Sequence, residues 1–430
     1  MKKKNTNEIK IFSDTIKDVG GYTEVQEVFG IMTGNINLDS IPYLKEANIQ
    51  GIRNVINRIP EEGDDGFKYP SWASGYDNHF ETKEESYDWF DKFLQKEPYS
   101  TWEEYLIKKD HPEPASRYFD DSSFGSVSVT LSPHPCLFDG RLERDLDASR
   151  EHVAAYIDAL KKSNPETTST LKYFQIQNEP NQGRFWAGQF DGNQKKTAES
   201  YTNVFNGLYD YIKEQHPEVN FIGTCVGHNG TYTIKNHDYD HKWEEDFVKD
   251  TKSIDWDTWV KYFIDNVSNP EALKYYNSQA YCIPPVRNFV NASLTQNYSE
   301  NKRGVRPRYV ITETSAPVDG SKAEQFQTQF LFHCSDIFMM LNNPDKFASR
   351  TAFVASTPHK EYSIFHIEDG EIVPQAPYWL FLTYKNLRGK NLHYEADNKD
   401  IRVFASAPDE NKVVIGLFNP TGEKQKVNLD

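Results

Sequence analysis

Short hydrophobic runs alternate with longer amphipathic stretches along most of this chain. A short apolar, β-branched or aromatic run bounded by turn residues is typical of a buried strand, whereas apolar positions three and four residues apart are typical of a helix. Eight strand-like runs occur, at residues 28–32, 51–56, 126–131, 173–179, 221–226, 275–281, 308–314 and 351–356. Eight strands alternating with helices predict an α/β fold, a parallel (β/α)8 TIM barrel.

Two connections are much longer than the others. Residues 60–125 separate the second and third predicted strands, and residues 227–257 follow the fifth. Connections of this length are uncommon in a compact domain unless they hold a helix or a functional loop. We expect both to wall the carboxyl ends of the strands, which leaves open whether they form a groove for endo action or a pocket for exo action.

The pattern changes after residue 388. Residues 376–387 form a last amphipathic stretch with Pro377 in its first turn, and short alternating runs follow at residues 401–406 and 413–419. We assign residues 20–388 to the barrel and residues 389–430 to a small C-terminal antiparallel β-sandwich. Because about three strands make no stable sandwich unaided, we expect the N-terminal strand at residues 8–13 to join it. Whether the natural chain continues past Asp430 stays open.

Two glutamates lie where predicted strands give way to loops. Glu179 is part of Asn178-Glu179-Pro180, and Glu313 follows Thr312. In a parallel barrel the carboxyl ends of all strands share one rim, so both carboxyl groups are expected there. An acid that protonates a leaving oxygen and a carboxylate that attacks or activates water are what breaking a glycosidic bond requires. In a chain with 64 acidic residues a lone glutamate is more simply a solvated charge; the two motifs together favour a catalytic pair.

Asn178-Glu179-Pro180, followed 134 residues later (313 − 179) by Thr312-Glu313, resembles clan A of the glycoside hydrolases. The resemblance covers residues 29–357 and implies that Glu179 is the acid/base and Glu313 the nucleophile of a retaining, double-displacement glycoside hydrolase. Together with the runs at 401–406 and 413–419, the chain resembles family 86, the β-agarases and β-porphyranases, and families 39 and 30 carry a comparable appendage. The resemblance implies an agar-type galactan as substrate, with xylan- or glucan-type β-glycosides as the alternative.

The same resemblance implies roles for three more polar residues. Asn178 would hold the sugar 2-hydroxyl, Tyr281 would donate a hydrogen bond to the nucleophile, and Arg53 would anchor that nucleophile from the second strand. Each has a plainer structural alternative. Arg53 can be a structural ion pair, with Arg58 competing for its role, and Tyr281 can be an ordinary core tyrosine.

Two further side chains are candidates through their own chemistry. Trp186, seven residues after Glu179, is predicted to stack on a sugar ring, with packing beneath its loop as the alternative. His134 is predicted to bind a sugar hydroxyl, with a structural histidine as the alternative. The resembled clan usually places a tryptophan at the end of strand eight, where Phe353 and Thr357 stand here, so we expect an altered subsite floor.

Composition limits the partners. A net charge of −16 argues against nucleic acid and against an anionic membrane, and no stretch of about 18 apolar residues could span one. Aromatic residues make up 14% of the chain, and aromatic faces are what sugar rings stack on, although most of them will be core. We therefore predict a neutral or lightly charged polysaccharide or oligosaccharide; a strongly sulfated one would require a local basic site.

No cofactor is predicted. The four cysteines are widely spaced, without the CxxC pairs or histidine spacing of a zinc site, and we expect them to be buried thiols. A serine esterase or metallohydrolase would contain GxSxG or HExxH, and neither occurs. A catalytically inactive carbohydrate-binding barrel is the remaining alternative from another class.

The N-terminus does not fix the location of the protein. Residues 1–8 are basic like the start of a signal peptide but lack the apolar segment that must follow. The protein is therefore expected to be cytoplasmic if this N-terminus is native, and secreted or periplasmic if a leader was trimmed.

Overall fold

The computed structural model describes residues 6–32, 40–55, 128–132, 171–181, 192–227, 256–281, 285–316, 321–353, 363–397 and 399–430, with a few single residues between 143 and 190. The chain forms two compact units. The first unit holds residues 1–51, 281–293 and 308–430, and the second holds 52–280 and 294–307. Most of both long insertions predicted above lies outside the described residues.

Three parallel strands form the centre of the first unit. Strand β10 (Phe347–Ala352) pairs in parallel with β2 (Glu27–Met32) on one side and with β9 (Arg308–Ser315) on the other. All six residues of β10 are buried, as expected for a parallel strand covered on both faces. Helix α11 (Lys322–Leu341) links β9 to β10, so the unit contains a strand–helix–strand crossover. The eighth strand predicted at 351–356 thus begins four residues earlier, because the charged Arg350 interrupts its hydrophobic pattern.

The second unit contains two groups of parallel strands. Their order is β3-β4-β5-β6 in one group and β7-β8 in the other. Their bounds are β3 (Gly51–Val55), β4 (Ser128–Ser132), β5 (Leu171–Phe174), β6 (Asn220–Phe221), β7 (Gly223–Val226) and β8 (Tyr275–Tyr281). The first residue of β3 and the last residue of β8 belong to the first unit. The predicted fifth strand is divided at Ile222, whose N–H donates to the carbonyl of Phe174 at 2.8 Å.

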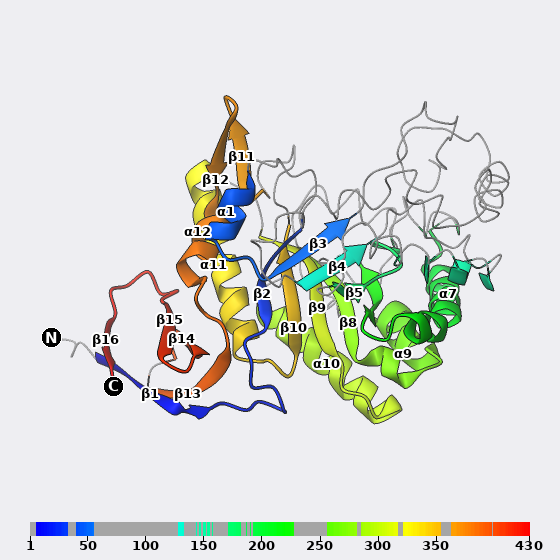
Figure 1. Cartoon of the computed structure of the whole chain (residues 1–430), viewed down its shortest axis with the longest axis horizontal. Helices are drawn as coiled ribbons and strands as arrows, with labels where there is room; N and C mark the ends of the chain where they lie inside the picture. The colour runs from blue at the N-terminus through cyan, green and yellow to red at the C-terminus, as the bar shows by residue number, and fades with distance from the viewer. Residues whose placement is uncertain are drawn as a thin grey trace. The chain divides into compact units, whose positions relative to one another are not determined.

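Helices alternate with these strands, which makes the chain an α/β protein (Figure 1). The remaining helices are α1 (Ile41–Glu46), α7 (Gln194–Gln215), η6 (Asp257–Lys261), α9 (Tyr262–Asn266), η7 (Pro270–Leu273), α10 (Pro285–Arg303) and α12 (Ala376–Tyr384). Two of the long helices begin at side-chain caps: Asn193 caps α7, and Ser321 with Glu324 forms a capping box on α11. In the described part of the chain, no helix combines the length and apolarity that a membrane crossing requires.

Five strands form a separate sheet in the first unit, which we call the accessory sheet. Its order is β15-β14-β13-β1-β16, and Figure 1 shows the C-terminal end of the chain beside it. The strands are β1 (Thr6–Ile16), β13 (Lys390–Ala396), β14 (Arg402–Asp409), β15 (Lys412–Phe418) and β16 (Lys426–Leu429). Strand β1 pairs antiparallel with β13 and parallel with β16, and Ile9, Ile401 and Val403 form the core on this sheet. The described strands thus form one sheet here, where a two-layer sandwich was predicted.

The chain turns from α12 into the accessory sheet at Gly389. Its φ is +77°, and a Cβ at this position would lie 2.1 Å from the carbonyl oxygen of Ala407. Only glycine fits both the left-handed conformation and the close approach. This turn coincides with the sequence-based boundary at 388/389, which stays a prediction, as does the boundary at residue 20. A hairpin of β11 (Phe365–Glu368) and β12 (Glu371–Pro374) precedes α12.

Candidate active site

Glu179 lies in the second unit on a strained loop. Strand β5 ends at Phe174, so Glu179 stands five residues beyond the strand. Its φ is +46°, its side chain is buried, and its N–H donates to the carbonyl oxygen of Cys225 at 3.0 Å. A left-handed conformation is rare for a residue with a Cβ, and the surrounding structure must enforce it.

Two residues of β7 share this left-handed conformation, and Asn277 bonds both, one through its side chain and one through its backbone carbonyl. Thr224 has a φ of +94° and Cys225 a φ of +46°. Asn277 Oδ1 accepts the N–H of Cys225 at 2.8 Å, and the carbonyl of Asn277 accepts the hydroxyl of Thr224 at 2.9 Å. Asn277 Nδ2 donates in turn to Gln175 Oε1 at 2.8 Å. A buried network of neutral amides therefore fixes the backbone to which Glu179 is bonded.

The orientation of Asn178 follows from its two donors. Arg53 Nη2 and Gln279 Nε2 donate to Asn178 Oδ1 at 2.6 Å and 2.7 Å. A guanidinium group can only donate, so the atom facing Arg53 must be the amide oxygen. Asn178 is partly exposed, and Nδ2 has no hydrogen-bond partner among the described residues. This amide can therefore donate to another molecule next to Glu179.

Glu313 lies in the first unit on a regular strand. It is the sixth residue of β9, is 4% exposed, and accepts a hydrogen bond from the hydroxyl of Tyr281 at 2.5 Å. The ring of Tyr281 contacts Phe353 edge to face at a centroid distance of 5.4 Å. An ionised carboxylate only accepts hydrogen bonds, so this donor fits the charged form of Glu313.

A chain of buried charged and polar groups stands behind the Glu313 strand. Arg350 Nε donates to Asp336 Oδ2 at 2.6 Å, both side chains are fully buried, and Arg350 Nη2 contacts His333 Nδ1. His333 Nε2 lies 3.0 Å from Gln329 Oε1, and Gln329 Nε2 donates to the carbonyl of Ala316 at 3.3 Å. The network therefore connects a buried ion pair to the backbone three residues after Glu313.

Burial sets the charge of this network. Desolvation, with the positive charge of Arg350 as a second cause, holds the pKa of His333 well below its ordinary value of 6.5. A neutral imidazole can accept from Arg350 through Nδ1 and donate to Gln329 through Nε2, which matches both contacts. Burial also lowers the pKa of Arg350, and Asp336 opposes that shift.

Trp186 requires a correction. The prediction that it stacks on a sugar ring is wrong, because its side chain is 0% exposed. Its Nε1 donates to the hydroxyl of Ser200 at 3.2 Å, and its ring packs on Tyr201 of α7 at 5.2 Å. A ring with no exposed face cannot be a stacking platform, so Trp186 is a packing residue, the alternative that the sequence had left open.

The other predicted residues separate into two groups. Arg53 and Asn178 contact each other in the second unit, and Tyr281 and Glu313 contact each other in the first. His134, together with Arg58 and Thr357, lies outside the described residues.

Several site residues escaped the sequence analysis. They are Gln175, Asn277 and Gln279. The available signal was an unusual one: three amide side chains lie within or just after strands that are otherwise buried. A buried amide requires partners, and strand positions that carry one can therefore indicate a site.

No cluster that could hold a metal ion occurs in the described part of the chain. Cys225 and Cys334 are buried thiols that form no disulfide, and the other two cysteines lie outside the described residues. The pKa of Cys334 is raised to about 12 by burial.

Comparison of sequences finds no relative. No protein-family model and no curated protein sequence matches the chain.

Comparison of structures does find relatives. A family 86 glycoside hydrolase solved in complex with neoagarooctaose is 13% identical, with a TM-score of 0.58 over 93% of this chain and 66% of its own length. A β-porphyranase of family 86 from the human gut bacterium Bacteroides plebeius is 15% identical, with a TM-score of 0.57 over 96% of this chain and 66% of its own. A family 39 β-xylosidase from Caulobacter crescentus is 14% identical, with a TM-score of 0.56 over 98% and 83%.

The chain therefore spans just under two-thirds of the length of the family 86 enzymes it matches. At these identities the likeness concerns the fold. In its fold the chain resembles the clan A glycoside hydrolases, among them enzymes of families 86, 39 and 30.

Proposed function

We propose that the protein is a retaining glycoside hydrolase that cleaves β-glycosidic bonds in a polysaccharide. The observation that carries the proposal is the hydrogen bond from Tyr281 to the nearly buried carboxylate of Glu313. A carboxylate that is desolvated yet aimed by a hydroxyl donor suits a nucleophile that must be ionised and fixed in direction. The fold shared with clan A glycoside hydrolases supports this assignment.

The proposal includes the (β/α)8 barrel of that clan, with Glu179 and Glu313 at the carboxyl ends of its strands. In the first step Glu313 attacks the anomeric carbon while Glu179 gives its proton to the departing glycosidic oxygen. The bond from Glu313 to the sugar forms as the bond to the leaving group breaks. In the second step Glu179 takes a proton from water, the water oxygen attacks the anomeric carbon, and Glu313 departs as a carboxylate.

Asn178 is proposed to bind the sugar hydroxyl nearest the reacting carbon. Arg53 and Gln279 both occupy its oxygen, so Nδ2 remains as the donor. A hydrogen bond to the 2-hydroxyl strengthens as the oxocarbenium-like transition state forms, and it therefore favours the reaction rather than mere binding.

We propose an agar-type galactan as the substrate, because family 86 enzymes are among the structural relatives and one of them was solved with neoagarooctaose. A xylan or related β-glycoside is the second candidate, favoured by the likeness to a β-xylosidase and an endoxylanase. Incubation with agarose, porphyran, xylan and β-glucan, read as reducing ends and product length, decides between them. If reducing ends are released from xylan alone, the second candidate, a xylan, is the substrate.

Substitution of each glutamate tests the mechanism. Glu313→Ala should abolish turnover of every glycoside, because the covalent step is lost. Glu179→Ala should fail on polysaccharide yet retain turnover of an aryl glycoside with an acidic phenol, which needs no proton, and azide should increase that turnover. Glu371→Ala, at an exposed glutamate of β12, is the control and should leave both activities unchanged. Full activity of Glu313→Ala would overturn the proposal.

A further inference from the structure

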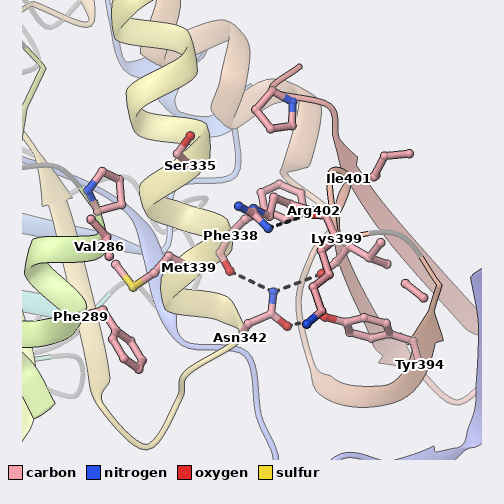
Figure 2. Close-up of a pocket in the computed structure, with 14 residues that line it drawn as sticks. Val286, Phe289, Ser335, Phe338, Met339, Asn342, Tyr394, Lys399, Ile401 and Arg402 are labelled. Carbon is pink, nitrogen blue, oxygen red and sulfur yellow. Dashed lines mark hydrogen bonds between the residues drawn. The ribbon is translucent and has the colours of Figure 1, made fainter. Parts of the chain in front are cut away.

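The first unit contains a pocket apart from the residues around Glu313, because neither Glu313 nor Tyr281 lines it. Figure 2 shows it between α10 and α11 on one side and the accessory sheet on the other. Its volume is about 660 Å³. Pockets that bind small organic ligands measure roughly 300 to 1,000 Å³, so this one has the size of a ligand site.

Apolar side chains and one fixed polar pair line the inside of the pocket. Phe338 and Met339 line it from α11, and Ile401 and Val403 line it from the chain segment that leads into and includes β14. The hydroxyl of Tyr394 donates to Asn342 Oδ1 at 2.6 Å, and Asn342 Nδ2 donates to the carbonyl oxygens of Phe338 and Val403 at 3.0 and 3.1 Å. Asn342 is thereby fully bonded, which fixes the tyrosine ring in the wall and makes this side of the pocket pre-formed.

The charged residues of the pocket are both cations. Lys399 and Arg402 line it, both are exposed, and no carboxylate lies within ion-pair distance of either in the described chain. Arg402 Nη1 donates to the carbonyl oxygen of Lys399 at 2.8 Å, which holds the two residues together. None of the described lining residues is acidic, although the chain carries a net charge of −16. This is the local basic site that an anionic sugar group would require.

We propose that this pocket is a second, non-catalytic saccharide site that binds a sugar residue carrying an anionic substituent. The apolar wall and the Tyr394 ring take the C–H face of the sugar, and Arg402 and Lys399 take the sulfate or carboxylate. The choice of a saccharide rests on the proposed function, whereas the preference for an anion rests on the pocket alone. A lightly charged polysaccharide would thus be held, through its anionic sugar residues, on the same unit that contains Glu313.

Binding to the full-length Glu313→Gln protein, which leaves the ligand intact, tests this proposal. The probes for calorimetry are a sulfated galacto-oligosaccharide, the same oligosaccharide after desulfation, an oligogalacturonate, and inorganic sulfate alone. The variants are Lys399→Ala with Arg402→Ala to remove the charge, and Ala396→Trp to fill the pocket from an exposed lining position. Lys412→Ala with Lys426→Ala removes two cations from the accessory sheet outside the pocket and is the matched control.

The charge-removal variant should bind the sulfated oligosaccharide at least about tenfold more weakly at this site, because charge-assisted hydrogen bonds are lost. The pocket-filling variant should lose the site, and the control should retain it. Binding of the sulfated oligosaccharide should weaken as salt rises, because exposed cations are screened. Comparing the affinities of the sulfated galacto-oligosaccharide and the oligogalacturonate shows whether the pocket prefers a sulfate or a carboxylate substituent.

Three results would overturn the proposal: unchanged affinity in the charge-removal variant, equal affinity for the desulfated oligosaccharide, or inorganic sulfate binding as tightly as the sugar. Aryl-glycoside hydrolysis by otherwise wild-type protein separates the two proposals. If Glu313 is needed for hydrolysis but the pocket variants bind normally, only the second site is wrong. If the pocket binds as expected but Glu313→Ala is active, only the catalytic proposal is wrong.

Discussion

The surroundings of the two glutamates are built in opposite ways. Glu179 stands on a loop whose backbone is strained, with left-handed conformations at Glu179, Thr224 and Cys225 held by neutral amides. Glu313 stands in an extended strand, is aimed by a phenol hydroxyl, and has the ion pair of Arg350 and Asp336 behind it. One carboxyl group is thus positioned through its backbone and the other through its side chain.

This difference matches the two proposed roles. A general acid must deliver a proton and later remove one, so its carboxyl group has to be held in one place through both steps. A nucleophile must stay ionised, and a hydroxyl donor fits only an accepting carboxylate. Because charge is concentrated behind Glu313 and strain around Glu179, substitutions in the two regions should fail in different ways.

The largest effect is expected from breaking the ion pair behind Glu313. Asp336→Ala leaves Arg350 buried without its carboxylate and should lower the free energy of unfolding by about 3 to 5 kcal/mol. On the other side, Asn277→Ala removes only neutral hydrogen bonds and should cost about 1 to 3 kcal/mol. Urea unfolding measures both.

The paired substitution Arg350→Met with Asp336→Leu is the control, because it removes both charges and should recover most of the loss. Equal losses of unfolding free energy in Asp336→Ala and Asn277→Ala would contradict the expected difference between the buried ion pair behind Glu313 and the neutral amides near Glu179.

The next largest effect is expected from removing the hydrogen bond that orients the carboxylate of Glu313. Tyr281→Phe removes the hydroxyl but keeps the ring contact with Phe353, and should lower kcat about 10- to 150-fold, the value of a hydrogen bond to a charged group. Steady-state kinetics on an aryl glycoside measures it. Tyr378→Phe is a matched control, since Tyr378 also donates to a glutamate, Glu46, at 2.9 Å between α12 and α1. Similar losses in both variants would mean a general structural effect.

Below neutral pH, the free energy of unfolding should depend on the protonation of His333. Its folded-state pKa is depressed by burial, so its contribution is fully present above pH 6.5, where both states are neutral. As pH falls below 6.5, His333 becomes protonated in the unfolded chain but stays neutral in the folded chain. The free energy of unfolding therefore falls by up to about 1.4 kcal/mol per pH unit. His333→Gln should therefore flatten the fall of the free energy of unfolding below pH 6.5.

His393→Gln, at a half-buried histidine of the accessory sheet, is the control for that profile and should follow the wild type. An unchanged acid limb in His333→Gln would show that the buried imidazole does not titrate as its surroundings indicate.

The smallest effect tests the strain around Glu179. Thr224→Ala and Thr224→Gly both lose the hydroxyl, but only glycine relieves a φ of +94°, so the glycine variant should be more stable by about 1 kcal/mol. At Thr202, in the middle of α7, the order should reverse, because glycine is disfavoured in helices. Thermal unfolding compares the stabilities of the four variants. If alanine and glycine rank in the same order at both positions, the backbone at Thr224 is not strained.

Much of the α/β pattern could be predicted from the sequence because buried parallel strands are hydrophobic runs. The strand carrying Glu313 was predicted within one residue, whereas β10 was placed four residues too late because Arg350 and Ser349 interrupt its pattern. Those polar residues are buried through partners outside the strand, Asp336 of α11 and the backbone of Glu27 in β2. A local pattern cannot contain that information.

The site was predictable to a different degree on its two sides. The resemblance implied a tyrosine hydroxyl beside Glu313, and Tyr281 donates one there, although its catalytic role stays a prediction. The strain at Glu179 and the burial of Trp186 could not be predicted. The first depends on Asn277 about a hundred residues away, and the second on Ser200 and Tyr201 of a helix that covers the ring.

The place of β1 in the accessory sheet has a consequence for synthesis on the ribosome. Ile9 pairs with Ala396 of β13 and with Leu429 of β16, so β1 has no partner on one edge until synthesis reaches residue 396 and none on the other until it reaches residue 429. At about 5 to 20 residues per second this delay lasts roughly 20 to 80 s. During that time an unpaired strand can template aggregation. Glu8, Lys10 and Asp14 place charges on the waiting strand, and such charges keep a nascent edge from joining its neighbours on the same messenger RNA.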